Sequence, residues 1–376
     1  MIPMKRNVGI LTFPISEAGN IPLSNLVGIL EVLSNDLYLI TGNDGYAFFK
    51  EDTRIHAYGI KHESGASVFA RILRYIYTQL RISFKLAKIR RNVDLWVFFI
   101  GGEGLLLPML TAMVLGKKVV IASAGSGLKI AQAQKNSLAK MFALLQSISY
   151  RLSDRIIIYS GRLIEEYGLQ KYRNKFSVAH EHFLDFDRFK IKKAFGERDN
   201  LVGYIGRLSQ EKGVINFVKA IPEISKEKED MKFLLGGNGQ LKDEIEEYLN
   251  REYLNGKVKL AGWIPHDELP EYLNEFKLVV LPSYTEGLPN VILEAMACGT
   301  PVLATPVGAI PDVIKDGETG FIMENNSPEC IAKNIIRALN HPDLEKIAEN
   351  ERKLVEQEFT FERAVERYKK ILEREI

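Results

Sequence analysis

The sequence predicts an α/β protein that contains two parallel-sheet domains. Short, continuous apolar segments that suit buried strands alternate with segments of helical periodicity. This alternation is typical of a parallel sheet whose two faces are covered by helices. The alternation begins again near residue 200, and a length of 376 residues favours two domains of about 100–200 residues each.

The elements of the first half follow one another in a regular order. The apolar segments predicted as strands are residues 7–13, 55–60, 93–100, 118–122 and 155–159. The segments predicted as helices are residues 26–33, 68–91, 105–115 and 137–152. Residues 95–116 are apolar enough to suggest a membrane span, but Glu103, three glycines and Pro108 interrupt them. A buried charge near the middle of a span is costly, so a strand, a glycine turn and a short helix are predicted instead.

The second half repeats the same pattern. Its predicted strands are residues 200–206, 231–235, 258–261, 278–281 and 301–304. Its clearest helices are 214–225, which contains Pro222, and the acidic segment 240–254. Residues 342–376 are also expected to be helical. Polar and charged residues accumulate at 189–199, which places the predicted junction there. We therefore expect an N-terminal domain at 1–190, a second domain at 191–355 and a C-terminal helix at 356–376.

The composition excludes several classes of protein. Hydrophobic residues make up 46% of the chain and charged residues 26%, which is ordinary for a globular protein and excludes general disorder. Cys298 and Cys330 are too few for a disulfide framework or a cysteine-based zinc cluster. Residues 1–14 lack the long apolar region of a secretory signal. These features favour a cytoplasmic protein.

The charge is distributed unevenly along the chain. The net charge is +2, yet residues 64–153 contain 13 basic residues and two acids. That excess of +11 leaves −9 on the remainder and indicates a surface that meets an anionic partner. Within it, the predicted helix 68–91 combines seven basic residues with aromatic and aliphatic ones and contains no acid. This pattern suits an anionic membrane surface, although a core helix with a solvated basic face is the alternative. No nucleic-acid-binding motif accompanies the charge.

The densest motif is PSYTEGLPNVILEAMACGTPVLATPVG at residues 282–308. A strand ends at Pro282, and a helix is predicted to begin near Pro289 and to stop at Gly299. Glu286 precedes the helix, whose N-terminus favours anions. Glu294 lies within the helix among apolar residues, where a carboxylate needs donors such as sugar hydroxyls. The alternative is a solvated helix residue and a loop acid.

Two glycine-containing turns precede helices in the same half. The turn GRLSQEKG at 206–213 contains Arg207 and Lys212, five residues apart. A guanidinium binds phosphate oxygens bidentately and an ammonium adds a compact charge, so the two cations could hold a diphosphate. The turn GGNG at 236–239 permits close backbone approach to a ligand. Either turn could also be an ordinary connection between a strand and a helix.

Together these motifs resemble those of the retaining GT-B glycosyltransferases, specifically glycosyltransferase family 4, the group 1 glycosyltransferases. Glu286 and Glu294 match its E-x7-E motif, and GRLSQEKG is similar to its diphosphate element. LLGGNGQLKDEIEEY and VKLAGWIPHDELPEYL resemble its glycine turn and the segment that approaches the nucleobase. LDFDRF at 184–189 resembles its linker pattern. The resemblance extends from about residue 184 to 339 and is mostly architectural before that.

The resemblance implies a fold, a reaction and roles for individual residues. The fold would be GT-B, with two Rossmann-like domains facing a central cleft and a C-terminal helix packing back on the first domain. Arg207 and Lys212 would bind the donor diphosphate, and Glu286 would contact the transferred sugar. The remaining donor contacts implied by the resemblance are Glu294 to the ribose, the backbone of Gly287 and Leu288, Gly237, Ile264 near the base, and Gly19 in the first domain.

The reaction implied is transfer of a sugar, with retention, from a nucleoside-diphosphate sugar to a lipid-linked glycan or another polysaccharide precursor. A UDP-sugar is favoured over a GDP-sugar, and neither a metal nor another cofactor is expected. The family's usual first-domain His is absent, because residues 121–127 read IASAGSG, and His180 and His182 are interpreted as linker residues. The alternatives are a sugar-nucleotide epimerase, a glycogen-synthase-like enzyme, or a non-catalytic nucleotide-sugar-binding membrane partner.

Overall fold

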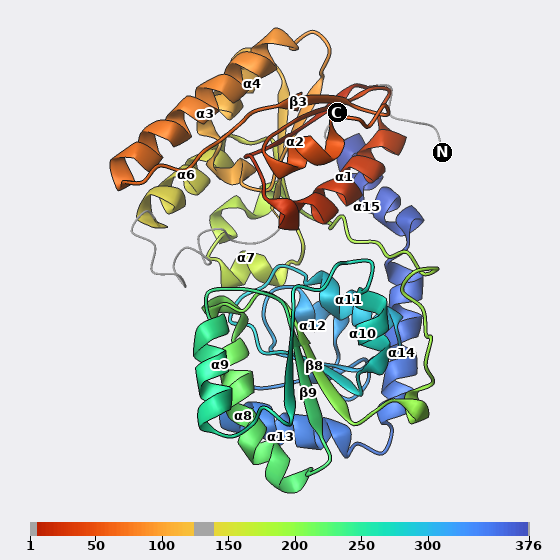
Figure 1. Cartoon of the computed structure of the whole chain (residues 1–376). Helices are drawn as coiled ribbons and strands as arrows, with labels where there is room; N and C mark the ends of the chain where they lie inside the picture. The colour runs from red at the N-terminus through yellow and green to blue at the C-terminus, as the bar shows by residue number, and fades with distance from the viewer. Residues whose placement is uncertain (1–5, 124–138, 375–376) are drawn as a thin grey trace. The chain divides into compact units, whose positions relative to one another are not determined.

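The computed structural model describes residues 6–123 and 139–374 and divides the chain into two compact units (Figure 1). Unit 1 contains residues 1–183 and 361–376, and unit 2 contains residues 184–360. The chain thus returns to unit 1 for its last helix. Among the described residues, no helix is both long and apolar enough to cross a membrane.

Unit 1 is built on a seven-stranded sheet in which all the neighbouring strands are parallel. The spatial order is β3-β2-β1-β4-β5-β6-β7, so the chain reverses direction across the sheet between β1 and β4. The strands are β1 (Val8–Thr12), β2 (Leu37–Thr41), β3 (His56–Gly59), β4 (Leu95–Phe99), β5 (Lys118–Ser123), β6 (Arg155–Ile158) and β7 (Phe176–Val178). β1, β2 and β4 are buried along their whole length, as continuous apolar strands predict.

The helices of unit 1 connect these strands in the predicted alternation. They are α1 (Asn20–Leu33), α2 (Asp44–Phe49), α3 (Val68–Lys88), α4 (Leu106–Val114), α6 (Ala139–Leu152), α7 (Arg162–Glu166) and α15 (Phe361–Arg374). Ser67 caps α3, because its side chain accepts a hydrogen bond from the Ala70 amide. The apolar residues 95–116 form β4, a 3₁₀ turn at Gly102–Gly104 and α4, as predicted.

Unit 2 repeats the architecture with six parallel strands in the order β10-β9-β8-β11-β12-β13. The strands are β8 (Leu201–Ile205), β9 (Lys232–Gly236), β10 (Val258–Gly262), β11 (Leu278–Leu281), β12 (Val302–Ala304) and β13 (Phe321–Ile322). The helices are α8 (Val214–Glu227), α9 (Lys242–Arg251), α10 (Leu269–Glu275), α11 (Asn290–Ala297), α12 (Ile310–Val313), α13 (Pro328–Leu339) and α14 (Leu344–Glu358). α8 and α13 pack against each other, as Figure 1 also shows.

The C-terminal helical segment is divided between the units. α14 packs on α11 within unit 2, whereas α15 packs on α1 within unit 1. One face of α15 joins the buried core of unit 1 through Ala364, Val365, Tyr368, Ile371 and Leu372. The expectation that a C-terminal helix packs on the first domain is therefore confirmed.

Three strands were not predicted from the sequence. β2 is a five-residue apolar segment, whereas β7 and β13 have only three and two residues. β7 and β13 are too short to show a period, so only their pairing in the sheet identifies them, whereas β2 is as long as β1 and was missed. The parallel architecture was nevertheless predicted correctly.

Candidate active site

The sheet topology of unit 2 brings most of the predicted site residues to one place. β9 lies on one side of β8 and β11 on the other, so the connections after β8 and β11 leave in opposite directions. Ligands of open α/β sheets bind outside the carboxyl ends of the strands at such a switch point. The turn containing Arg207 and Lys212 follows β8, and the loop containing Glu286 follows β11. Residues 74 positions apart in the chain therefore become neighbours.

Lys212 and Glu286 form the central contact of this site. The Lys212 Nζ lies 2.6 Å from Glu286 Oε1, and the Ser283 hydroxyl donates to the same oxygen over 2.7 Å. The Lys212 and Glu286 side chains are 18% and 7% exposed, so water screens this ion pair poorly. This ion pair therefore holds the Lys212 ammonium, which has three donors, in a fixed position.

Arg207 is held by a second acid on the same turn. Its Nη2 lies 3.1 Å from Oε1 of Glu211, whose side chain is almost fully buried. The Arg207 side chain itself is 54% exposed, so the guanidinium remains open to a ligand from solvent. The Tyr204 hydroxyl donates to the Arg207 carbonyl oxygen over 2.7 Å, and burial raises the pKa of that hydroxyl well above its usual value. The phenol therefore stays protonated and supports the turn.

Two glycines allow these turns to pack closely. Gly213 has φ of +66°, and a Cβ there would lie 2.0 Å from the Pro282 carbonyl oxygen after β11. Gly237 has φ of +133°, and its Cβ would lie 1.9 Å from the Gly206 carbonyl oxygen after β8. Any side chain at either position would separate the loops. Glycine is therefore needed at both positions for two reasons: it adopts the positive φ, and it lets the loops pack closely.

Glu294 lies on α11 and has a partner that the sequence analysis did not single out. Its Oε1 is 2.7 Å from Nε2 of His266, and its side chain is 7% exposed. His266 follows β10, and its ring packs near Phe189 at a centroid distance of 5.4 Å. His266 occurs inside the quoted segment VKLAGWIPHDELPEYL, so the signal was present but could not be distinguished from a loop histidine.

Three further residues of unit 2 were predicted to contact the sugar-nucleotide donor. The Gly287 carbonyl oxygen accepts a hydrogen bond from the Ala309 amide over 2.8 Å, and Leu288 is buried. Ile264 is also buried and lies against Gly236, where a Cβ would be 2.4 Å from its Cδ1. These backbone and apolar contacts hold the loops of unit 2 that contain Gly287 and Ile264.

The residues predicted in the first domain lie in unit 1. Gly19 ends a 3₁₀ turn at Glu17–Gly19 and immediately precedes α1. Ser123, at the end of β5, donates a hydrogen bond to the Glu103 carboxylate, which also accepts from Tyr150 (2.7 Å) and Gln146 (2.6 Å). Residues 124–127 of the stretch that replaces the family histidine lie outside the described residues.

His180 and His182 lie at the end of unit 1 in a buried cluster. Their rings pack against each other and against Tyr159, whose hydroxyl donates to Glu181. Arg367 of α15 lies 3.3 Å from His180 Nδ1 and donates to the His182 carbonyl oxygen over 3.1 Å. These contacts join the end of the sheet to the C-terminal helix. Burial also lowers the pKa of His180 well below its usual value.

Metal ligands do not cluster in the described part of the chain. Within residues 6–123 and 139–374, no group of three or more His, Cys, Asp or Glu side chains is placed to hold a metal ion. The basic side chains at the predicted donor site are those of Arg207 and Lys212, each paired with a glutamate.

Part of the chain matches a known protein family. Residues 185–354 match the family model for group 1 glycosyl transferases. The alpha-D-kanosaminyltransferase of Streptomyces kanamyceticus is 32% identical over 179 residues, which cover 46% of each chain, so this relative matches over less than half of its length. The N-acetyl-alpha-D-glucosaminyl L-malate synthase of Bacillus anthracis is 26% identical over 383 residues, covering 98% of this chain and 97% of that protein.

The comparison of structures covers nearly the whole chain. The crystal structure of Anabaena HepE in complex with UDP superimposes with a TM-score of 0.77 at 18% identity, covering 99% of this chain and all of that one. Together with the two parallel sheets, this likeness shows that the fold is GT-B, as the sequence predicted.

Proposed function

We propose that this protein transfers a sugar from a nucleoside-diphosphate sugar to a glycan or lipid-linked acceptor, with retention of anomeric configuration. The observation that supports this most directly is the pairing of Lys212 with Glu286 at the switch point of unit 2, beside the exposed Arg207. A polyanionic leaving group needs cationic partners, and a sugar with many hydroxyls needs a hydrogen-bond acceptor beside them.

The roles of the site residues follow from their positions. Arg207 and Lys212 bind the diphosphate, and Glu286 contacts the sugar near its reacting face. Glu294, positioned by His266, accepts hydrogen bonds from the ribose hydroxyls. The remaining donor contacts are the backbone of Gly287 and Leu288, the Gly237 turn, Ile264 beside the base, and Gly19 of unit 1.

In the proposed reaction the acceptor hydroxyl oxygen forms the new bond to the anomeric carbon while the bond from that carbon to the phosphate oxygen breaks. The acceptor proton passes to an oxygen of the departing phosphate on the same face of the sugar. Charge develops on the diphosphate as it leaves, and in this proposal Arg207 and Lys212, which the ion pairs with Glu211 and Glu286 hold in place, stabilise it. Such preorganised charge lowers the barrier without reorganisation during the reaction.

The comparisons support a uridine nucleotide as the donor. HepE has been crystallised with UDP and with UDP-glucose. We therefore propose a UDP-sugar as the donor, and a GDP-sugar is the alternative to be tested.

A thermal-shift panel of UDP-, GDP- and ADP-sugars tests the donor. A ligand at one hundred times its Kd stabilises the folded state by about 2.7 kcal/mol, so the preferred donor should stand out. A transfer assay with the selected donor then tests the reaction, and activity should persist in EDTA. Donor binding without transfer or hydrolysis would favour a non-catalytic binding protein. Isomerised donor would indicate an epimerase, and elongation of a glucan would indicate a glycogen-synthase-like enzyme.

We further propose that unit 1 associates with the inner face of the cell membrane. α3 exposes one apolar face formed by residues spaced three or four apart: Phe69, Leu73, Ile76, Leu80 and Phe84. The opposite face packs on the unit through Thr78, Gln79, Ile82 and Leu86. A helix that is apolar on its solvent side and basic along its flank is typical of peripheral membrane attachment. This arrangement supports a lipid-linked acceptor.

A further inference from the structure

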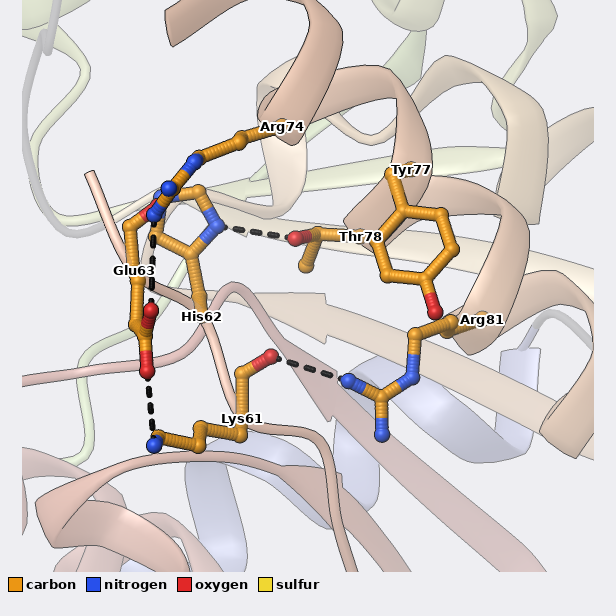
Figure 2. A pocket seen from close by; sticks show the side chains of 7 residues that line it. All are labelled: Lys61, His62, Glu63, Arg74, Tyr77, Thr78 and Arg81. Atoms are coloured by element: carbon orange, nitrogen blue, oxygen red, sulfur yellow. Dashed lines mark hydrogen bonds and ion pairs between the residues drawn. The ribbon is translucent and has the colours of Figure 1, made fainter. Parts of the chain in front are cut away.

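A hollow lined with basic residues lies beside the exposed apolar face of α3 (Figure 2). Its volume is about 220 Å³, and the residues that line it are Lys61, His62, Glu63, Arg74, Tyr77, Thr78 and Arg81. Pockets for drug-sized ligands begin at roughly 300 Å³. The hollow is therefore of a size for a headgroup rather than for a whole sugar nucleotide.

The charges in the hollow favour an anion. Lys61, Arg74 and Arg81 contribute three positive charges against the single carboxylate of Glu63. That carboxylate lies 2.6 Å from the Lys61 ammonium and 3.4 Å from the Arg74 guanidinium, and Figure 2 shows all three side chains at one end of the hollow. Arg81 donates to the Lys61 carbonyl oxygen over 3.1 Å, which directs its guanidinium towards the same hollow.

The floor of the hollow is firmly built. His62 Nδ1 lies 2.8 Å from the buried Thr78 hydroxyl. The His62 ring packs edge-on against Phe13, which follows β1, at a centroid distance of 4.7 Å. Phe13 also contacts Tyr75, whose hydroxyl donates to the Gly104 carbonyl oxygen after β4 over 2.6 Å. The hollow thus lies beside the carboxyl ends of β1, β3 and β4, the edge at which parallel sheets bind ligands.

The hollow borders the apolar face of the same helix. Arg74 and Arg81 are seven residues apart, which places them on one flank of α3 between its buried and exposed faces. Tyr77 lines the hollow and is itself 62% exposed, next to Ile76 and Leu80 of the apolar face. A molecule with a hydrocarbon chain on that face would bring its headgroup to the two arginines. A guanidinium pair binds phosphate oxygens better than it binds a neutral headgroup.

We propose that this hollow binds the phosphate or diphosphate group of an amphiphilic acceptor whose hydrocarbon chain lies along the apolar face of α3. This inference rests on the proposed transferase function and names the chemical class of its acceptor. The phosphate belongs to the acceptor itself, and bulk anionic lipid is the competing source that the experiment must separate.

Isothermal titration of the full chain with dodecyl phosphate below its micelle concentration tests the proposal. The wild-type protein should bind dodecyl phosphate at least tenfold more tightly than inorganic phosphate and at least tenfold more tightly than dodecyl maltoside. Arg74→Gln with Arg81→Gln should weaken dodecyl phosphate binding at least tenfold. The matched control is Arg71→Gln with Arg90→Gln, which removes the same charge outside the hollow, from α3 and from the residues that follow it, and should change affinity less than twofold.

Several outcomes would overturn the proposal. Equal losses in the two double variants would show a diffuse basic surface that attracts bulk anionic lipid. Equal affinity for inorganic and dodecyl phosphate would show that the hydrocarbon chain does not contribute to binding. Equal affinity for dodecyl phosphate and dodecyl maltoside would show that the phosphate does not contribute. Lys61→Gln is a second test outside α3 and should also weaken dodecyl phosphate binding. Sugar-nucleotide binding is measured on every variant, so failure of the donor assignment would be seen separately.

Discussion

At the scale of single residues, the candidate site depends on acids that are almost completely buried. Glu211, Glu286 and Glu294 each have a side chain that is 7% exposed or less, and each lies beside a basic partner. Removing one member of a buried pair leaves the other without compensation, which is often more damaging than losing the pair. The thermal stability of each variant of this site must therefore be measured together with its ligand affinity.

Arg207→Ala and Lys212→Ala should each weaken binding of a nucleoside diphosphate. A charge-assisted hydrogen bond contributes roughly 1.5–3 kcal/mol, so losses of about ten- to one-hundredfold in Kd are expected. Titration calorimetry with UDP provides the measurement. Lys219→Ala is the control, because Lys219 is exposed on α8. Wild-type affinity in both variants would eliminate the diphosphate assignment.

The two motif glutamates should have separable effects. Glu294→Gln should mainly raise the Kd for the donor, because ribose binding differs little between ground and transition states. Glu286→Gln should mainly lower kcat, because Glu286 is assigned to the reacting sugar and positions Lys212. Steady-state kinetics separates the two parameters, with the exposed Glu268→Gln as the control. The reverse pattern would mean that the two roles must be exchanged.

At the scale of one element, α3 exposes an apolar face to solvent. An amphipathic helix normally buries its apolar face, and α3 buries Thr78 and Gln79 while exposing Phe69 and Phe84 to 71% and 74%. A helix that exposed only basic residues would be an ordinary solvated helix. The combination with exposed aromatic side chains adds an apolar contribution to any membrane binding.

Sedimentation with liposomes tests this element directly. The protein should bind anionic vesicles, bind neutral vesicles little, and be released by high salt, since each basic residue near the surface contributes about 1 kcal/mol. Phe69→Ser with Phe84→Ser should reduce binding, as should Lys85→Glu with Lys88→Glu. Tyr253→Ser removes an even more exposed aromatic from unit 2 and should have no effect. A wild-type protein that ignores anionic vesicles at low salt would favour a soluble acceptor.

A second element, α15, should matter for the stability of unit 1 despite its distance in sequence. Leu372→Ala removes a fully buried side chain from the core that α15 shares with α1. Such truncations cost about 2–5 kcal/mol, so the midpoint of thermal unfolding should fall. Lys370→Ala, on the exposed side of the same helix, should leave it unchanged. Equal midpoints for both variants would show that α15 does not stabilise the unit.

At the scale of the whole molecule, each unit joins chain segments that are far apart, and buried titratable groups lie where they meet. Glu181 is one of these, since it accepts a hydrogen bond from Tyr159 near Arg367 of α15. Burial raises the pKa of its carboxyl from 4.5 to about 7. The folded state therefore binds this proton more tightly than the unfolded state does.

The stability of the molecule should consequently depend on pH. Between about pH 4.5 and 7 the folded state holds a proton that the unfolded state has lost, so the free energy of unfolding should fall as pH rises. The contribution of Glu181 is on the order of 3 kcal/mol across that window. Urea unfolding of wild type and Glu181→Gln should show a smaller slope in the variant. If the free energy of unfolding falls equally with pH in wild type and Glu181→Gln, the pKa of Glu181 is the same in the folded and unfolded states.

The sequence by itself determined the class of the fold and singled out the main candidate site residues. Continuous apolar strands require a sheet covered on both faces, and this predicted the parallel architecture of both units. Arg207, Lys212, Glu286 and Glu294 were identifiable because their motifs lie directly after strands or at a helix start. Local spacing contains that information.

Only the tertiary structure decided which of these residues are partners. The strand order of unit 2 places β8 beside β11, and this joins Lys212 to Glu286 across 74 positions of sequence. The partnership of His266 with Glu294 and the packing of α15 on unit 1 are decided in the same way. The tertiary structure also decides which face of α3 is buried, because an amphipathic pattern does not indicate which face packs against the rest of the unit. Periodicity describes one segment at a time, whereas burial and pairing depend on what the rest of the chain places against it.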